Sequence, residues 1–320
     1  MTSEVSYCTL FDSAYLPQGL ALYKSLCRYS PGFTLWVLPM DSGCHQFLED
    51  AALPGIRLLE LSQVEDQEIL AIKANRTHGE YCWTLTPVLI ARVLELETQS
   101  SLVTYIDADC WLAGPVMPLI DAFLASSADC MITPHFYPEG SKLIKTAGTY
   151  CVQFMPFKAS AKSFEMLSLW RHRCLQSCSS SLSGSGLGDQ IHLEDWPRLF
   201  AGHVFVLDQP LLTLAPWNVE HLWTSDNLPL CLYHFQGFRL FRVWSFVVVR
   251  SSAKVRLPRW LNRTLLEPYI SDVCDSLNQI PSRFRRVRSI PPPWSDPRGY
   301  FLFLPRLLLL NWQLKIYFLP

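Results

Sequence analysis

The stretch Thr104-Tyr105-Ile106-Asp107-Ala108-Asp109 decides the fold class of this chain. It closes an apolar run that predicts a buried β-strand over residues 102–106, and it ends in two carboxylates one residue apart. Side chains at the carboxyl ends of parallel strands lie where open α/β sheets bind ligands. Two hard oxygen ligands suit Mg²⁺ or Mn²⁺, and such a cation binds phosphate oxygens. Capping of a turn by the two Asp side chains is the structural alternative.

The chain around this stretch alternates short apolar runs with segments of helical periodicity. This alternation is typical of parallel strands joined by crossover helices, so we expect an α/β fold. The expected strands lie at 6–11, 33–40, 56–61, 102–106, 131–134, 150–157 and 204–207. The expected helices lie at 15–29, 45–52, 118–126 and 161–174, and 64–97 is expected to be mostly helical with a break near Thr86-Pro87.

Composition limits the classes of function. The 320 residues are 49% hydrophobic and carry a formal net charge of −1. That length and apolar content allow one large domain with an appendage. Nucleic-acid binding normally needs a strongly basic face, so no nucleic acid is expected as a partner.

The eleven cysteines indicate a reducing compartment. Their number is odd, their spacing does not repeat, and the closest pair, Cys174 and Cys178, lacks the second Cys or His pair of a zinc site. The first residues lack a signal-peptide pattern, and no apolar run reaches the ~18 to 20 residues that span a bilayer. We therefore expect a cytoplasmic protein with free thiols.

Two later elements could complete a site with the Asp pair. His234 alone would be a core histidine, but beside two carboxylates it is a candidate third metal ligand, and Gly237 would let the backbone approach a phosphate. Asp189 and Gln190 join a run rich in Ser and Gly, 177–188, to a helical segment. Asp189 is therefore either a helix N-cap or, with Gln190, a group that a loop presents to a sugar.

The same residues belong to an ordered set of motifs. They are Tyr7-Cys8-Thr9-Leu10-Phe11-Asp12-Ser13 with Tyr15-Leu16 and Gly19-Leu20, then Tyr105-Ile106-Asp107-Ala108-Asp109, Gly188-Asp189-Gln190, Ala215-Pro216-Trp217-Asn218 and Tyr233-His234-Phe235-x-Gly237. Together they resemble a bacterial group of nucleotide-diphospho-sugar transferases, similar to the glycogenin-like retaining glycosyltransferases. The resemblance covers residues 5–245.

The resemblance implies a GT-A fold, with a mixed, mainly parallel central sheet flanked by helices, and a metal-dependent, retaining glycosyltransferase. The expected donor is a nucleotide diphosphate-sugar, with uridine as the expected base. In the family, the positions of Asp107, Asp109 and His234 hold Mn²⁺ (or Mg²⁺) against the donor diphosphate. The expected donor contacts are Thr9, Phe11, Asp12, Lys73, Arg76, Asp107, Ala108 and Gly237. Asp189 and Gln190 are the expected catalytic residues, which orient the sugar or stabilise its anomeric centre.

Two positions depart from the family pattern. The histidine motif usually continues to a lysine, whereas this chain continues Phe238-Arg239, and the planar guanidinium of Arg239 is not equivalent to the point charge of a lysine. Cys151 stands where the family usually has an asparagine. The departures affect a predicted phosphate contact and the acceptor contacts.

The predicted organisation has three parts, which are a catalytic domain at 1–245, a helical extension at 246–280 and a tail at 281–320. The tail has seven cations against one acid, among aromatic and leucine residues. It would either hold the protein at an anionic membrane surface, on the inner face of the cell membrane, or pack on the catalytic domain.

The predicted acceptor is a glycan, a lipid-linked group or a protein. Two other functions are compatible with the residues: a catalytically silent sugar-nucleotide-binding protein and a nucleotidyltransferase. A nucleotidyltransferase normally has a basic, Gly-rich loop after the first strand, where this chain has Asp12-Ser13-Ala14-Tyr15. The carboxylate and histidine ligands favour catalysis over silent binding.

Overall fold

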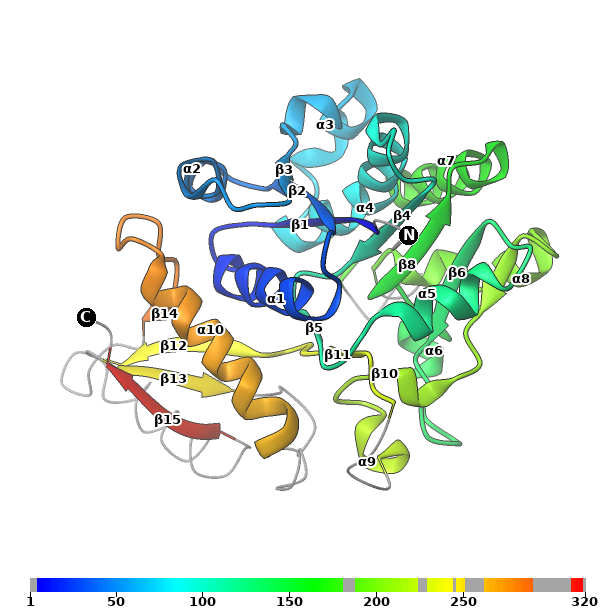
Figure 1. The fold of residues 1–320 in the computed structure, drawn as a ribbon. Helices are drawn as coiled ribbons and strands as arrows, with labels where there is room; N and C mark the ends of the chain where they lie inside the picture. Colours follow the sequence, from blue (N-terminus) through cyan, green and yellow to red (C-terminus); the bar gives the residue numbers. More distant parts are fainter. Residues whose placement is uncertain are drawn as a thin grey trace.

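The central element of the computed structural model is an eight-stranded sheet in the order β3-β2-β1-β4-β8-β6-β7, with β9 paired to β6 (Figure 1). The structure describes residues 5–180, 188–223, 229–243, 246–250, 262–289 and 312–318. The strands of this sheet are β1 (Ser6–Phe11), β2 (Thr34–Pro39), β3 (Ile56–Leu58), β4 (Leu102–Ile106), β6 (Cys130–Pro134), β7 (Tyr150–Cys151), β8 (Phe154–Lys158) and β9 (Val204–Val206).

Strand direction divides this sheet into two halves. The four strands β1, β2, β3 and β4 run parallel to one another, whereas β8 is antiparallel to both β4 and β6. The sheet is therefore mixed and α/β in class, as predicted. β1 pairs with β2 on one side and with β4 on the other, so the strand order reverses at β1. Open α/β sheets bind ligands at such a switch point, beyond the carboxyl ends of the strands.

Helices cover both faces of the sheet (Figure 1). One buried apolar cluster joins the sheet to α1, α2 and α5, and a second joins it to α4 and α7. Neighbouring residues of a strand face opposite clusters, as Tyr7 and Cys8 of β1 do. The helices are α1 (Leu16–Tyr29), α2 (Ser42–Ala51), α3 (Gln67–Lys73), α4 (His78–Leu96), α5 (Met117–Leu124), α6 (Ile144–Ala147), α7 (Ala161–Gln176), α8 (Trp196–Leu199), α9 (Val219–Leu222) and α10 (Glu267–Gln279).

Helix α4 continues through Thr86-Pro87, so the predicted break there is wrong. The helical segment is interrupted between α3 and α4 instead, where Thr77 and Glu80 start α4 with a capping box. A proline inside a helix costs about 3 kcal/mol. Burial of neighbours such as Leu85 and Leu89 stabilises the helix by about 1.5–3 kcal/mol each, which outweighs that cost.

A second sheet and helix α10 position His234. Strands β10, β11 and β5 form a three-stranded sheet in which His234 lies opposite Cys110. Helix α10 packs on α1 and on this sheet, where the rings of Phe235 and Tyr269 stack with centroids 3.5 Å apart. The strands are β5 (Cys110–Leu112), β10 (Thr213–Leu214) and β11 (Leu232–His234).

A third sheet has the order β14-β12-β13-β15 and draws strands from all three predicted parts of the chain. Its strands are β12 (Arg239–Val243), β13 (Phe246–Arg250), β14 (Arg288–Ser289) and β15 (Trp312–Phe318). The division at residues 245 and 280 stays a prediction. Residues 181–187 of the Ser/Gly run and residues 290–311 of the tail lie outside the described residues. Within the described ranges, no helix is both long and apolar enough to cross a bilayer.

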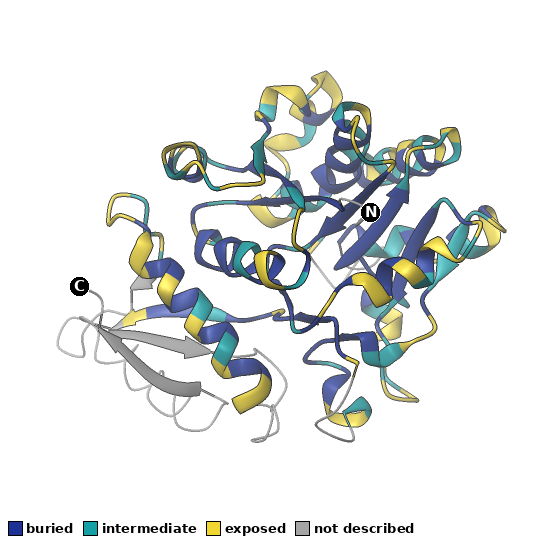
Figure 2. Ribbon diagram, in the orientation of Figure 1, coloured by how far each residue is buried: buried dark blue, intermediate teal, exposed yellow. Residues whose placement is uncertain are grey.

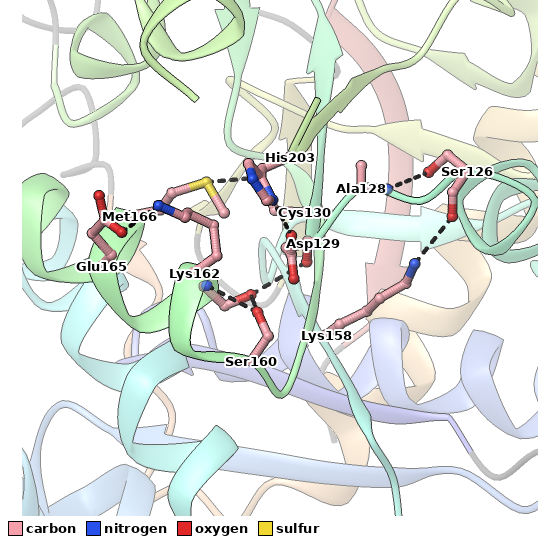
Figure 3. A network of polar contacts seen from close by, with 11 residues as sticks. Ser126, Ala128, Asp129, Cys130, Lys158, Ser160, Lys162, Glu165, Met166 and His203 are labelled. Carbon is pink, nitrogen blue, oxygen red and sulfur yellow. Dashed lines mark hydrogen bonds and ion pairs between the residues drawn. The ribbon is translucent and has the colours of Figure 1, made fainter. Parts of the chain in front are cut away.

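A polar network holds the start of β6 in place (Figure 3). The Asp129 carboxylate pairs with His203 at 2.6 Å, and the Asp129 carbonyl accepts from the backbone N–H of Lys158 at 2.8 Å. The ammonium of Lys158 donates to the carbonyl of Ser126 at 3.1 Å. These contacts fix the strand whose other end leads to His135 in the cavity described below.

Candidate active site

A cavity of about 580 Å³ opens at the carboxyl ends of β1 and β4, at the switch point of the sheet. One half is lined by the residues after β1 and by the start of α4, and the other half by the residues after β6 and β10. Nine of the predicted site residues line it, namely Phe11, Asp12, Asp107, Ala108, Asp109, Asp189, Gln190, His234 and Gly237.

Asp107, Asp109 and His234 converge in this cavity, with one ligand atom of each within 4.8 Å of the others. His234 Nε2 lies 3.1 Å from Asp109 Oδ1 and 3.7 Å from Asp107 Oδ2. Pairing of β11 with β5 brings the histidine there, and the N–H of Phe235 donates to the Asp109 carbonyl at 2.8 Å. Two carboxylates and one imidazole fit a divalent cation that accepts both oxygen and nitrogen ligands.

Burial and mutual charge set the protonation of this cluster. Desolvation raises the pKa of Asp107 to about 7; the charge of Asp109 adds to the rise and His234 opposes it. Desolvation also acts on Asp109, but His234 and Arg239 hold its pKa below the usual range. Desolvation lowers the pKa of His234, yet the attraction of Asp109 raises it well above the usual value. Without a cation the cluster therefore holds an imidazolium paired with the Asp109 carboxylate.

Gln153 fixes the orientation of His234. Its Oε1 lies 3.1 Å from His234 Nδ1, so the Nδ1–H donates to the amide and Nε2 faces the two carboxylates. The Gln153 carbonyl accepts from the N–H of Asp107 at 3.2 Å. Gln153 lies between β7 and β8, where the predicted strand 150–157 is interrupted. Sequence reasoning gave Gln153 no role, because its contact depends on the antiparallel pairing of β8 with β4.

The loop after β1 is held by Asp41, which sequence reasoning also missed. Asp12 Oδ1 accepts from the N–H of Tyr15 at 3.0 Å, and its Oδ2 pairs with His78 at 2.9 Å on the cavity wall. Asp41 accepts from the N–H of Ser13 at 2.8 Å and also caps α2. Its position two residues after β2, at the same edge of the sheet, is the signal that could have identified it.

Phe11 lines the cavity because Gly19 leaves room for its ring. A Cβ at Gly19 would lie 2.6 Å from Phe11 Cζ, so the first turn of α1 can lie over the ring only with glycine at this position. Thr9, two residues earlier on β1, is fully buried away from the cavity. Its predicted contact with the donor stays a prediction.

The structure does not bring Lys73 and Arg76 to the cavity. Lys73 Nζ pairs with Glu65 at 2.6 Å. The guanidinium of Arg76 donates to the carbonyls of Cys174 and Cys178, each at 3.1 Å, and so caps the end of α7. Their role at the diphosphate stays a prediction that these contacts do not support.

Asp189 lines the cavity and makes no side-chain capping bond in the described structure, so the N-cap alternative is not observed. Asp189 is 5% exposed, and its Oδ2 has no hydrogen-bond partner among the described residues. Burial raises the pKa of Asp189 well above its usual value, and the charges of Cys178 and Asp107 add to the rise. Gln190 Nε2 donates to the carbonyl of Ala147 at 2.5 Å, which holds the adjacent backbone in place.

An aromatic wall lines the part of the cavity that follows β6 and β10. The rings of His135 and Tyr137 stack with centroids 4.6 Å apart, and Trp217 meets His135 edge to face at 5.2 Å. Trp217 Nε1 and Asn218 Nδ2 both donate to the His135 carbonyl, at 2.9 and 3.0 Å. Phe136 has φ of +50°, which is uncommon for a bulky residue and marks a constrained turn. His135 follows a predicted strand directly, which is the signal that could have identified this wall.

Both departures from the family pattern line the cavity. Arg239 lies 5.2 Å over the ring of Tyr15 and is the one Lys or Arg among the described lining residues. Desolvation opposes ionisation of the Cys151 thiol, but His135 and His234 lower its pKa to about 6. All eleven cysteines, which lie in the described ranges, are free.

No family model matches this sequence. Two proteins of Bacillus subtilis (strain 168) described as uncharacterised are similar to it over most of their length. YfnF is 28% identical over 273 residues, which cover 81% of this chain and 89% of YfnF. YfnD is 24% identical over 299 residues, which cover 88% of this chain and 93% of YfnD.

Solved glycosyltransferases share the architecture of this chain. An active-site mutant of LgtC matches with a TM-score of 0.57 at 15% identity, covering 88% of this chain and 99% of LgtC. This chain has the GT-A fold. GlyE of Streptococcus pneumoniae TIGR4 has a TM-score of 0.52 at 16% identity, covering 91% of this chain and 66% of GlyE. Mouse xyloside xylosyltransferase 1 has a TM-score of 0.51 at 13% identity, covering 73% of this chain and 98% of the mouse protein. The GT-A prediction is confirmed, and the glycogenin-like subgroup stays a prediction.

Proposed function

We propose that this protein is a glycosyltransferase that moves a sugar from a nucleotide diphosphate-sugar to a glycan, lipid-linked or protein acceptor. The observation that carries the proposal is the cluster of Asp107, Asp109 and His234 in a cavity at the switch point of a GT-A sheet. LgtC, which has the same fold, is a galactosyltransferase whose structure was solved with donor and acceptor sugar analogues. One part of the cavity would hold the donor and another the acceptor.

The residues around the cluster would bind the donor diphosphate. Asp107, Asp109 and His234 would hold Mn²⁺ or Mg²⁺, which neutralises the charge that develops on the diphosphate leaving group. Arg239 places a second positive charge near Asp109 and would contact the same phosphates. Gly237 lines the cavity with φ of +82°, a conformation that favours glycine, and its lack of a side chain would leave room for the phosphates.

Phe11 and Asp12 would contact the nucleoside, since they line the half of the cavity next to β1. Uridine is the base that the family resemblance favours. A uridine diphosphate-sugar would then place its sugar toward the aromatic wall, where the acceptor would enter.

Asp189 would act on the transferred sugar. A buried carboxyl oxygen without a partner is costly until a ligand satisfies it, and Asp189, which lines the cavity, has such an oxygen in Oδ2. Its carboxyl, held neutral by the raised pKa, would hydrogen-bond a sugar hydroxyl and so orient the sugar. Gln190 would keep this carboxyl in position through its bond to Ala147. Retention of the anomeric configuration is part of the proposal on the resemblance alone.

The test is nucleotide release from a panel of uridine diphosphate-sugars with and without Mn²⁺. We expect release that depends on Mn²⁺, is abolished in Asp109→Asn and is retained in Asp121→Asn, an exposed control on α5. Asp189→Ala is expected to lower turnover by about 10²-fold with little change in donor affinity by calorimetry, because the sugar loses the group that orients it. Donor binding without any product would support the silent binding protein. Pyrophosphate release from nucleoside triphosphates would support the nucleotidyltransferase.

A further inference from the structure

Two exposed aliphatic residues at the rim of the cavity lie between two exposed lysines, in the sequence Lys142-Leu143-Ile144-Lys145. Leu143 and Ile144 are each 44% exposed, and Leu143 lines the cavity. Among the described residues, no other two exposed large apolar side chains are neighbours in the sequence. Figure 2 shows the turn that leads into α6 as exposed. Single exposed apolar residues are ordinary, whereas an apolar pair flanked by cations is typical of interfacial contacts.

The lysines of this segment differ from the other lysines that the structure describes. Neither Lys142 nor Lys145 has a hydrogen-bond or ion-pair partner for its ammonium among the described residues, and both are exposed. The remaining lysines with described side chains are all engaged, as Lys24 with the Asp272 carbonyl, Lys73 with Glu65, Lys158 with the Ser126 carbonyl and Lys162 with Glu165. The rim therefore presents free positive charge on both sides of the apolar pair.

The rim segment, residues 138–147, is an ordered turn whose backbone bonds are satisfied locally. The N–H of Ser141 donates to the Pro138 carbonyl at 3.1 Å, and the N–H of Ala147 donates to the Leu143 carbonyl at 2.8 Å. Gln190 ties Ala147 to the site at 2.5 Å. The exposure of the aliphatic pair is therefore set by a fixed backbone that is bonded to a residue of the cavity.

We propose that the rim segment docks the mouth of the cavity on an anionic lipid surface. Leu143 and Ile144 would enter the interface between headgroups and acyl chains, and the two ammonium groups would contact lipid phosphates on either side. Charge complementarity selects this occupant, because Glu139 is the one acid of the segment against two free cations. The proposal is independent of sugar transfer, since it concerns binding of the protein without substrate.

The test is flotation of the full-length protein with vesicles of phosphatidylcholine, alone or mixed with phosphatidylglycerol. We expect binding to the mixed vesicles that weakens with added salt. Lys142→Ser with Lys145→Ser should lower the partition coefficient about 25-fold, at about fivefold per lysine. Leu143→Ser with Ile144→Ser should lower it about tenfold or more. The matched control is Leu70→Ser with Leu199→Ser, which removes aliphatic side chains of 49% and 46% exposure elsewhere on the molecule.

Three results would overturn the proposal. They are no flotation of the wild type with anionic vesicles, equal binding to neutral vesicles, and a loss in the control as large as in the rim variants. If Arg298→Ser with Arg306→Ser abolishes flotation and the rim variants do not abolish it, the tail binds the membrane and the rim segment does not. Thermal unfolding of each variant confirms that it is folded. The lysine variant should keep its nucleotide release in solution, which separates this proposal from sugar transfer.

Discussion

Replacing Asp107 and Asp109 separately by Asn is expected to move the stability of the metal-free protein in opposite directions. The two carboxylates are one residue apart and share His234, but their environments differ. Desolvation raises the pKa of Asp107 to about 7, whereas the pKa of Asp109 is lowered by the imidazolium of His234 and by Arg239 against its desolvation. Ionisation of Asp107 therefore opposes folding, and ionisation of Asp109 favours it.

The magnitudes follow from these environments. For Asp107, a rise in pKa from 3.8 to about 7 corresponds to at most about 4 kcal/mol of lost stability above pH 7. Its side chain is 27% exposed, and screening by solvent reduces this loss to about 2 kcal/mol. Asp107→Asn removes that penalty, and an Asn oxygen can still accept from Tyr105. Asp109→Asn removes a charge-assisted bond to His234, which costs about 1–2 kcal/mol because the histidine can lose its proton.

The pH dependence has a definite sign for Asp107. Between pH 3.8 and about 7 the folded state binds more protons at this carboxyl than the unfolded state, so stability falls as pH rises through that window. The gain in stability from Asp107→Asn should therefore be absent below pH 3.8 and complete above about pH 7.

The assay is thermal unfolding of the wild type and both variants across this pH range, with a chelator and then with Mn²⁺. About 1 kcal/mol corresponds to roughly 1.5 °C for a chain of this length, so we expect about +3 °C for Asp107→Asn and about −2 °C for Asp109→Asn near pH 8. Mn²⁺ at about 100 times its Kd should raise the wild-type Tm by about 4 °C and leave both variants unchanged. Shifts of the same sign without metal, or a retained response to Mn²⁺, would refute the reasoning.

Three further outcomes are expected. Gly19→Ala should destabilise the protein by about 1–3 kcal/mol and weaken donor binding by displacing Phe11, whereas Gly79→Ala, with nothing described within 4 Å of its Cβ, should be neutral or stabilising; equal Tm values would contradict this. Arg239→Ala should raise the donor KM about tenfold and Arg239→Lys less, in steady-state kinetics; an unchanged KM would remove Arg239 from the diphosphate site. Mn²⁺ affinity by calorimetry should rise with pH through about 7, because the cation competes with protons on Asp107 and His234.

Local patterns in the sequence were sufficient for the strands that carry the site. Residues 6–11 and 102–106 are strands as predicted, and Asp107 follows β4 directly, because the apolar run and the change to carboxylates lie within a few residues of each other. A wrong prediction in the same region, the break at Pro87, shows the opposite case. The helix continues because burial of its neighbours against the sheet outweighs the local preference of proline.

The candidate site was predictable only in part. Sequence motifs nominated Asp109 and His234, which lie 125 positions apart, but their 3.1 Å contact comes from the antiparallel register of β5 and β11. Arg76 was expected at the diphosphate, and that role stays a prediction. In the structure its guanidinium caps α7, since the direction of a side chain at a helix end depends on what packs beside it.

By itself, the sequence determined the α/β class, the strand that ends in Asp107, and the types of ligand that could hold a cation. The tertiary structure decided the contacts around these residues: Gln153 orients His234, Asp41 holds the loop after β1, and His135 lines the cavity. The physical reason is the range of the interactions. The backbone conformation of a residue depends mainly on the residues next to it in the sequence. Contacts in a cavity depend instead on strand register and burial, which the packing of all the elements determines together.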